Sequence, residues 1–292
     1  MPYLTDAQIR HYRDAGFVVV ENVVPPGLLE RARAAVDEFV TRSRGVTAHT
    51  DIFDLEPGHS PEAPRLRRIK NPVQHHPVFA EILRLDSVLD PVEQLVGPGI
   101  RLHGSKLNMK AAEFGSPVEW HQDLPFYPHT NDDLLAVGIA LDECTLENGC
   151  MLMVPGSHRG PMLDHHQDGV FAGAIDPEAH AETIARAVPV PVPAGGMSIH
   201  HCLTLHGSAP NTSSRPRRLL LFEFAALDAW PLMGVPDLAA FDAEIVRGEP
   251  VSEYRLKAGF TRIPLPKSER QGSIYEIQTI LRGERRAFAR ST

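Results

Sequence analysis

Cysteine is scarce in this chain of 292 residues, which has only Cys144, Cys150 and Cys202. Their spacings fit neither a CxxC nor a zinc-finger motif, and an odd number does not describe a disulfide framework. Long hydrophobic runs are also missing, since none approaches the ~20 apolar residues of a membrane span. The first residues lack the charged and then apolar pattern of a signal peptide. These absences predict a cytoplasmic protein in a reducing compartment, with no membrane association.

Positive charge is in deficit, with 29 Lys and Arg against 37 Asp and Glu and a net charge of -8. No dense Lys/Arg run interrupts this balance, so the phosphates of a nucleic acid or an anionic membrane would repel the chain. We therefore expect no nucleic-acid partner and a small-molecule substrate instead. The oligomeric state is not indicated by the sequence.

The 26 Pro and 22 Gly occur without a repeat, which is typical of a fold with many turns and short strands. Thr5 and Gln8 have the form of a capping box, and a helix is predicted from there to Gly16. Apolar residues at helical spacing predict a second helix over residues 28–42. From residue 100 onward the apolar runs are short and separated by turns, namely Leu134–Leu141, Met151–Val154, Val188–Val192, Met197–Leu205 and Leu219–Ala225. The predicted fold is mainly β, a jelly roll or barrel with N-terminal α-helices outside.

No linker divides the chain, so a single domain over residues 1–292 is expected. Its β core covers about 100–226, its helical flank 5–96 and a C-terminal extension 228–292, whose role the sequence does not indicate. The polar segment from Gly45 to about Pro64 is predicted to be a long loop. A lid and a solvated surface connection are equally compatible with it.

Histidine, in contrast, is abundant, with 15 residues. Non-haem Fe(II) oxygenases bind their metal through two histidines and one carboxylate and leave other positions open. The usual trace is His-x-Asp or His-x-Glu plus a distant histidine, because residues i and i+2 of a strand point to the same side. Chance predicts about one His-x-Asp in this chain. Three occur, at His49, His121 and His166, so at least two do not belong to a single metal site.

The surroundings of the three motifs differ. His49 lies at the edge of the polar loop with no strand signal before it, and His166 lies in a turn-rich polar stretch. His121 follows a plausible strand at Pro117–Trp120 and precedes an apolar stretch, so His121 and Asp123 are the strongest candidates.

A distant histidine is expected from a neighbouring strand. His206 ends an apolar run and is followed by a strong turn signal and then by another strand. On that strand Arg217 or Arg218 could bind a carboxylate, since the guanidinium offers a fixed fork of donors. Of the adjacent His200 and His201, only one can face a pocket, and a hydrogen-bonded role is favoured for each. A buried structural histidine is the competing interpretation of His206. His103, His129 and His158 are expected to lie at the surface or to support ligands, and not to bind the metal themselves.

At these positions the sequence resembles the phytanoyl-CoA dioxygenase family of Fe(II)/2-oxoglutarate oxygenases. The resemblance is carried by Trp120–Asp123, by Leu146–His158 and by His206–Arg217, with a family-like opening at Asp14–Val20. The blocks occur in the expected order over about residues 5–226. The joint match is therefore far more specific than any one motif.

The resemblance implies a double-stranded β-helix, a cupin-like jelly roll, with Fe(II) held by His121, Asp123 and His206. It implies 2-oxoglutarate and O2 as co-substrates and hydroxylation with release of succinate and CO2. Related halogenases replace the carboxylate with a small residue, so Asp123 favours oxygen insertion.

The resemblance also implies a co-substrate site. It selects Arg217 over Arg218, because the family's co-substrate arginine stands eleven positions after the distal histidine. Ser208 commonly assists the same carboxylate. Asn108 and Lys70 match upstream polar positions that contact 2-oxoglutarate, although an ordinary strand amide and a solvated lysine carry equal weight.

The substrate is not selected by the sequence, and a small, partly apolar metabolite is favoured. Phe126 and Tyr127 line a pocket or belong to the core, with equal support. The basic cluster binds a coenzyme A phosphate or a substrate carboxylate, or is a solvated face, which is favoured; it consists of Arg65, Arg67, Arg68 and Lys70. Two rival functions stay open: a metal-dependent cupin-type enzyme without 2-oxoglutarate, and a non-catalytic metal-binding relative.

Overall fold

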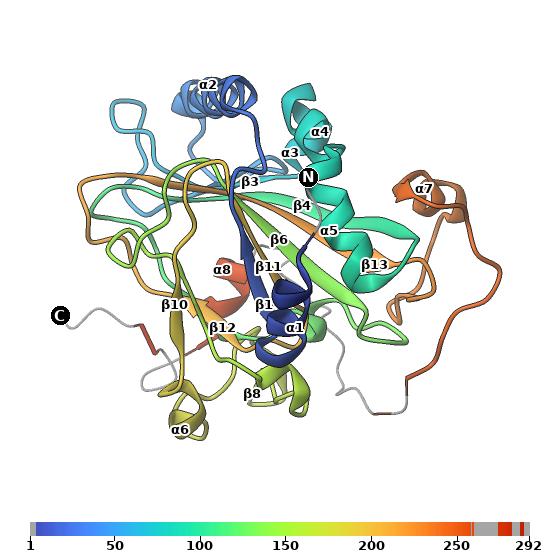
Figure 1. Ribbon diagram of the computed structural model, residues 1–292. Coiled ribbons are helices and arrows are strands. Elements are labelled where there is room, and N and C mark those ends of the chain that lie inside the picture. Colours follow the sequence, from blue (N-terminus) through green and yellow to red (C-terminus); the bar gives the residue numbers. More distant parts are fainter. Residues whose placement is uncertain (1–3, 258, 260–273, 282–286, 289–292) are drawn as a thin grey trace.

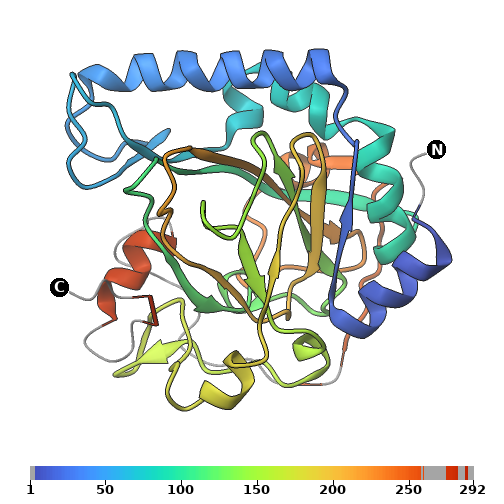
Figure 2. The same cartoon turned by 60° about the vertical axis from the view of Figure 1, so that its left-hand side comes forward.

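The computed structural model describes residues 4–257, 259, 274–281, 287 and 288. Two antiparallel sheets form its body, an eight-stranded sheet with the order β1-β11-β6-β13-β4-β3-β2 and β14 beside β4, and a four-stranded sheet with the order β10-β7-β12-β5. Figures 1 and 2 show them facing each other. This arrangement confirms the predicted jelly roll, a double-stranded β-helix.

The strands of the large sheet are β1 (Phe17–Val20), β2 (Phe53–Leu55), β3 (Leu66–Lys70), β4 (Ile100–Lys110), β6 (Leu134–Ala140), β11 (Met197–His201), β13 (Arg217–Ala226) and β14 (Ile245–Arg247). Those of the small sheet are β5 (Val118–His121), β7 (Met151–Met153), β10 (Val188–Val190) and β12 (His206–Ser208). A separate hairpin consists of β8 (His166–Gln167) and β9 (Val170–Phe171).

The helices are α1 (Asp6–Ala15), α2 (Pro26–Arg42), α3 (Pro72–His75), α4 (Pro77–Leu83), α5 (Asp86–Val96), α6 (Ala181–Ile184), α7 (Leu238–Ala243) and α8 (Ile274–Ile277). Most of the long ones precede the sheets in the chain, and α2, α4 and α5 cover the outer face of the large sheet (Figure 2). The main apolar core lies between these helices and that face. The N-terminal helical flank is thus confirmed.

Local chemistry explains the two helices that the sequence predicted. Thr5 and Gln8 form the capping box that begins α1, and Gly16 ends the helix with a φ of 87° that glycine adopts without strain. In α2 the residues at helical spacing are the buried ones, from Leu28 to Phe39. The apolar face that the sequence periodicity predicts is therefore the face that packs on the sheet.

Side chains alternate across the long strand β13. Leu220, Phe222 and Phe224 belong to the core beneath the helices. Arg217, two residues from Leu219, points the opposite way into the barrel and lines its cavity. The large sheet therefore has an apolar outer face and a partly charged inner face.

The predicted loop over residues 45–64 differs in one respect, because it contains strand β2. Phe53 of this strand pairs with Ile69 of β3, and both are buried. A strand of three residues is too short to show alternation in the sequence. The segment therefore extends the large sheet at its edge.

The C-terminal extension contributes to both sheets. Strand β14 pairs with β4 at Ile245 and Arg101. Gln278, just after α8, accepts a hydrogen bond from the Glu119 backbone at 3.1 Å and donates one to the Gly173 carbonyl at 2.8 Å. Among the helices described, none is long and apolar enough to cross a membrane.

Candidate metal centre

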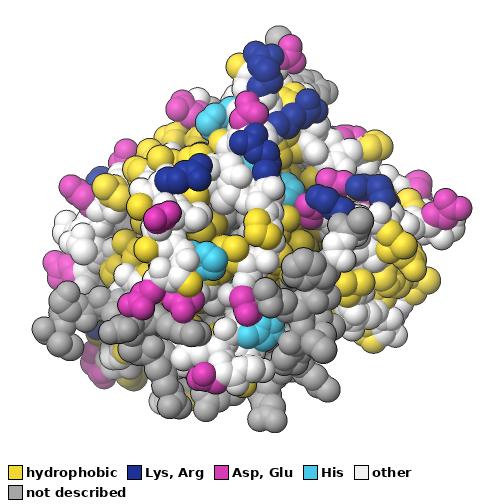
Figure 3. Space-filling view, turned by 90° about the horizontal axis from the view of Figure 1, so that it is seen from below, with side chains coloured by type: hydrophobic (Ala, Val, Ile, Leu, Met, Phe, Trp, Pro, Cys, Tyr) yellow, Lys and Arg dark blue, Asp and Glu magenta, His cyan; other side chains and the backbone are white. Residues whose placement is uncertain are grey.

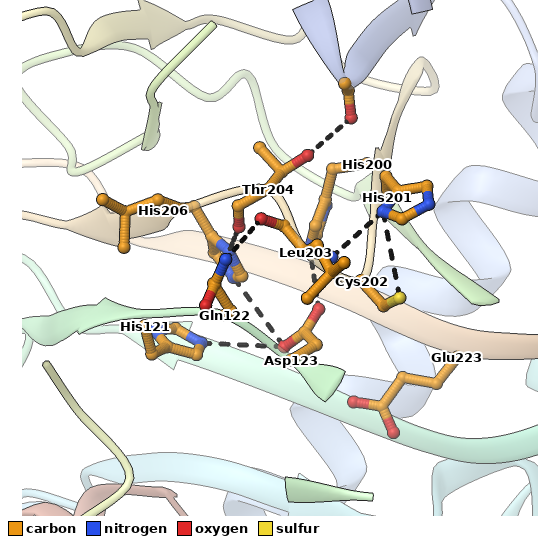
Figure 4. A network of polar contacts seen from close by, with 12 residues as sticks. His121, Gln122, Asp123, His200, His201, Cys202, Leu203, Thr204, His206 and Glu223 are labelled. Carbon is orange, nitrogen blue, oxygen red and sulfur yellow. Dashed lines mark hydrogen bonds and ion pairs between the residues drawn. The ribbon is translucent and has the colours of Figure 1, made fainter. Parts of the chain in front are cut away.

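Three predicted ligands lie together at the open end of the barrel. The side chains of His121, Asp123 and His206 are buried and offer one nitrogen or oxygen atom each within 4.8 Å of one another (Figure 4). His121 ends β5 and His206 begins β12, and the two residues pair directly across the strands. Asp123 is held by its backbone N–H, which donates to the Cys202 carbonyl at 2.8 Å.

Backbone carbonyls fix both imidazole rings. The Nδ1 of His121 lies 2.7 Å from the Glu119 carbonyl, and the Nδ1 of His206 lies 2.9 Å from the Thr204 carbonyl. Each carbonyl belongs to the residue two positions earlier, and it accepts the Nδ1 proton. The Nε2 atoms are left to point at Asp123, whose Oδ1 is 3.7 Å from His121 and 3.9 Å from His206. Such bonds select the ring tautomer that binds a metal.

The second oxygen of Asp123 has its own partner. His200 Nε2 lies 3.1 Å from Asp123 Oδ2, so the ring donates there and leaves Oδ1 for the centre. The other ring nitrogen, Nδ1, is buried and has no hydrogen-bond partner among the described atoms. His200 is the member of the predicted pair that faces the pocket. His201, in contrast, accepts a hydrogen bond from the Leu203 backbone.

Burial keeps both imidazole rings neutral, so the Nε2 atoms carry no proton. Burial lowers the pKa of His206 to about 4, with smaller contributions from His200 and Lys106. Burial and the nearby His206 hold the pKa of His121 well below its usual value. Burial alone would raise the pKa of Asp123, but the charge of His206 and the hydrogen bond from His200 outweigh it and lower that pKa. Two neutral imidazoles and one carboxylate are the protonation states of a metal-binding set.

A cavity extends from these residues into the barrel. It is lined by Arg68, Lys106, Asn108, Val118, His121, Asp123, Ala136, Met151, His200, His206, Gly207, Ser208, Arg217, Leu219, Leu221 and Ile274. Two guanidinium groups in it have spare donors: Arg217 Nε and Arg68 Nη2 are buried without a hydrogen-bond partner in the described part of the chain. Arg68 Nε donates to Asn108 Oδ1 at 2.9 Å. Buried, unused donors of this kind fit a carboxylate.

The predicted co-substrate residues divide into two groups. Arg217, Ser208 and Asn108 line the cavity. Lys70 does not, since its ammonium is turned to the Thr50 carbonyl and to Asp54, both within 2.9 Å. The preference for Arg217 over its neighbour agrees with the structure, because Arg218 points outward.

Arg218 is occupied on the outside of the sheet. Its guanidinium donates twice to Asp142 at 2.8 Å and also contacts Asp37 at 3.1 Å. This ion pair connects β13 to α2 and to the loop after β6. Arg218 therefore stabilises the packing of α2 on the outside of the sheet, although its neighbour Arg217 lines the cavity.

Two residues that line the cavity, and the ion-pair partner of one of them, were not singled out for these roles by the sequence. Arg68 was placed in a solvated basic face, whereas it is 7% exposed, and Lys106 and Glu223 drew no attention. Arg68 and Lys70 are two residues apart on β3 and share a face, so alternation alone does not choose between them. Side-chain contacts make the choice, because Arg68 donates to Asn108 in the cavity, whereas Lys70 turns to Thr50 and Asp54.

The other members of the basic cluster are also engaged. Arg67 donates to Glu56 at 3.1 Å, and the Arg65 guanidinium lies 3.8 Å from the centre of the Phe114 ring. The preferred interpretation as a solvated face is therefore wrong for Arg67 and Arg68. Tyr275 covers both of these guanidinium groups, at 4.8 and 5.2 Å.

The two other His-x-Asp motifs lie away from the centre. His49 accepts a hydrogen bond from the Leu55 backbone at 3.1 Å, and His166 contacts Asp164 at 2.9 Å. Near the triad, Phe126 meets the His121 ring edge-on with centroids 5.6 Å apart. Phe126 and Tyr127 also line a second cavity of about 450 Å³ beneath residues 231–244. Phe126 and Tyr127 therefore line this second cavity and also pack against neighbouring side chains.

The remaining histidines have protein partners. His129 contacts the Tyr127 carbonyl at 2.6 Å, and His158 contacts the Arg13 carbonyl at 3.1 Å. The His103 ring packs on Tyr127 with centroids 4.5 Å apart. These contacts agree with the expectation that none of the three binds the metal.

A jelly roll with two histidines and one carboxylate at its open end defines the class of non-haem metal oxygenases. Residues 12–219 match the model of the phytanoyl-CoA dioxygenase (PhyH) family, and the chain belongs to that family. It is an Fe(II)- and 2-oxoglutarate-dependent dioxygenase that hydroxylates a small molecule.

Particular relatives support this assignment. The chain is 35% identical over 280 residues to a probable alpha-ketoglutarate-dependent hypophosphite dioxygenase of Stutzerimonas stutzeri, covering 94% of this chain and 97% of the relative. It is 27% identical over 239 residues to the peroxisomal phytanoyl-CoA dioxygenase of Homo sapiens, covering 77% and 69%. The crystal structure of EctD from S. alaskensis with bound Fe has the same fold, with a TM-score of 0.67 at 23% identity and 88% coverage of each chain.

Proposed function

We propose that His121, Asp123 and His206 hold the Fe(II) of this dioxygenase. The observation that carries the proposal is the convergence of their three ligand atoms within 4.8 Å, with both imidazoles fixed by backbone carbonyls. When bound, the iron supplies the activation of O2 for hydroxylation. The chain contributes the ligand geometry, and it retains the carboxylate that favours hydroxylation over halogenation.

The co-substrate 2-oxoglutarate is anchored at the other end of the cavity. Arg217 is the main anchor, because it is 2% exposed and its Nε has no partner among the described residues. Arg68 takes the place proposed for Lys70, and Ser208 and Asn108 complete the polar lining. Buried guanidinium groups bind a carboxylate strongly because water does not compete for their donors.

Adjacent arginines provide the test of this site. Arg217→Met removes the buried anchor, and we expect the KM for 2-oxoglutarate to rise about 100-fold, as expected when one partner of a buried charge pair is lost. Arg218→Met is the matched control. It breaks the outer ion pair with Asp142 and should leave that KM within about twofold.

Two measurements check the result. Anaerobic protein with Fe(II) and 2-oxoglutarate should show the weak visible charge-transfer band of a chelated keto acid, and succinate release should follow substrate addition. If Arg217→Met keeps normal turnover, the cupin-type alternative without 2-oxoglutarate is correct. If wild-type protein shows neither the band nor succinate with any substrate, the metal-binding relative without catalysis is correct.

The remaining proposals concern the domain organisation, the cellular compartment and the substrate. Residues 1–292 act as one domain, with the C-terminal extension completing the wall of the cavity through Ile274. The cytoplasm is the compartment we propose, since Cys144, Cys150 and Cys202 are free and buried. The substrate is a small molecule, and hypophosphite, named for the relative from S. stutzeri, is the first to assay.

A further inference from the structure

The inner face of the large sheet is arranged in rows across the strands. One row contains four residues from neighbouring strands, in the order His200, Ala136, Glu223 and Gly104. Residues paired in this way share one face of a sheet. His200 is the residue that donates to Asp123. This row therefore places Glu223 near the metal centre, two strands from His200, and Figure 4 draws no direct contact between Asp123 and Glu223.

The next row into the barrel contains Gly138, Leu221 and Lys106. The third row contains Leu219 and Asn108. Arg217, the proposed anchor of 2-oxoglutarate, lies two residues before Leu219 on β13. With about 3.3 Å per strand residue, Glu223 and Arg217 are some 20 Å apart along β13. The backbone positions of Glu223 and Arg217 are therefore three rows apart on the inner face of the large sheet.

Lys106 and Glu223 form an ion pair at the metal end. The Lys106 ammonium contacts Glu223 Oε1, and the side chains are only 24% and 12% exposed. An ion pair of two largely buried groups contributes little net stability, because desolvation opposes the attraction. Neither residue belongs to the group of metal-binding side chains. The pair has no evident structural need, which points to a role in the reaction.

Small residues leave space around this pair. A Cβ on Gly104 would lie 2.9 Å from Glu223 Oε2, and Ala136, the neighbour on the other side, has only a methyl group. Gly138 sits in the row of Lys106, where a Cβ would lie 3.1 Å from Ser198 Oγ. The missing side chain of Gly104 therefore makes room for the Glu223 carboxylate, and a larger residue there would displace it from Lys106.

The charges around the cavity do not cancel. Its lining contains Arg68, Lys106 and Arg217 against one carboxylate, Asp123. Fe(II) and the dianion of 2-oxoglutarate add equal and opposite charge. With Glu223 included, one positive charge remains unmatched. A buried, uncompensated charge is costly, so the loaded site favours a ligand with a single negative charge.

We propose that Lys106 binds the anionic group of a small, singly charged substrate, and that Glu223 is the internal counter-ion which this group replaces. The inference rests on the proposed iron and 2-oxoglutarate site and adds the substrate class to it. The substrate's reacting bond then lies at the metal end of the cavity, next to the row of His200 and Ala136.

Hypophosphite is the probe, as a compact monoanion, with zwitterionic L-proline and neutral glycerol for comparison. Binding is measured by calorimetry on anaerobic wild-type protein loaded with Fe(II) and 2-oxoglutarate. We expect hypophosphite to bind more tightly than either comparison molecule. In Lys106→Met its affinity should fall at least about 30-fold, the effect of removing one member of a buried charge pair. Lys106→Arg should recover part of the loss.

Lys70→Met is the matched control. Lys70 pairs with Lys106 across the strands, yet its ammonium is turned to Asp54 outside the cavity, so hypophosphite affinity should not change. Glu223→Gln removes the competing carboxylate, and hypophosphite should bind a few-fold more tightly in it.

Four results would overturn the proposal: wild-type protein that binds no hypophosphite, wild-type protein that prefers L-proline or glycerol, Lys106→Met with unchanged affinity, or Glu223→Gln with weaker binding. The charge-transfer band with 2-oxoglutarate should persist in Lys106→Met and Glu223→Gln. Its loss in the wild-type protein would instead refute the underlying iron and 2-oxoglutarate site, so the two failures are distinguishable.

Discussion

His200 fixes one oxygen of the proposed iron ligand Asp123 while the other faces the centre. The bond is 3.1 Å long and both groups are buried, so no solvent competes for it. Supporting bonds of this kind orient a ligand before the metal arrives. His200 is therefore a positioning residue, which acts through Asp123.

Replacing His200 with Leu should weaken Fe(II) binding by about 10- to 100-fold, the usual effect of losing such a support. His200→Gln keeps an N–H donor and should recover part of the affinity. Anaerobic titration with Fe(II), followed by the charge-transfer band, measures the change. The KM for 2-oxoglutarate should stay constant, because Arg217 is untouched. Unchanged Fe(II) affinity in His200→Leu would show that Asp123 is held without this bond.

The three residues that converge as proposed iron ligands could be picked out from the sequence because their spacing and surroundings are local. His121 and Asp123 are two residues apart, and His206 is marked by the turn after it. The choice between Lys70 and Arg68 depends on contacts between side chains of paired strands: Arg68 donates to Asn108, forty residues away, whereas Lys70 turns to Asp54. Register over such a distance leaves no trace in local spacing.

The C-terminal segment closes one wall of the cavity. Ile274 lines it, and Tyr275, which is 6% exposed, covers Arg67 and Arg68. Gln278 ties the segment to the backbone of β5 through Glu119. This element lies beyond residue 219, where the match to the family model ends. The sequence predicted no role for it, because the segment has no periodicity and its packing is non-local.

Tyr275→Ala should raise the KM for 2-oxoglutarate several-fold, because water then reaches the guanidinium of Arg68 and weakens its attraction for a carboxylate. Tyr275→Phe is the control. It keeps the ring, and the hydroxyl it removes has no hydrogen-bond partner among the described atoms. Steady-state kinetics at varied 2-oxoglutarate separates the two variants. An equal KM in both would mean that the ring does not shield Arg68.

Element prediction succeeded where the pattern was long. The helix around Leu28 and Phe39 shows several turns of apolar spacing, and Leu219–Ala225, predicted as a strand, is a mostly apolar run within β13. Strand β2 was missed because three residues at a sheet edge give no pattern. The fold class could therefore be predicted from its long elements and its turns, and the edge of the large sheet could not.

At the scale of the whole molecule, acidic and basic side chains share the surface. The face in Figure 3 shows most of its Lys and Arg in the upper half of the view, and its Asp and Glu scattered over both the rim and the middle. The molecule has fifteen histidines, and several are buried. Its stability should therefore respond to pH mainly through those rings.

Acid should destabilise the metal-free protein between pH 6.5 and 4. Burial lowers the pKa of His165 to about 4, and the ring accepts a hydrogen bond from the Gln122 backbone at 2.8 Å. In this window the unfolded chain binds a proton that the native ring refuses, so the free energy of unfolding falls as pH falls. A shift of this size corresponds to about 3 kcal/mol for His165 once pH is below 4.

Urea unfolding of the metal-free protein at pH 7 and pH 5 measures this effect. His165→Gln should be less stable at pH 7, because a buried bond is disturbed, but should lose less stability on acidification than wild type. An identical loss in both proteins would show that His165 is not among the groups responsible.

The proposed iron ligands and the charged residues proposed to bind co-substrate and substrate come from different sheets. The proposed iron ligands belong to the small sheet and the turn after β5, whereas Arg68, Lys106, Arg217 and Glu223 all extend from the large one. Substitutions at Lys106 and Glu223 can therefore change which molecule binds while the iron ligands and the 2-oxoglutarate anchors stay in place. Related enzymes can acquire new substrates through such substitutions while they retain the same oxidation reaction. Protein engineering can change the substrate preference by the same route.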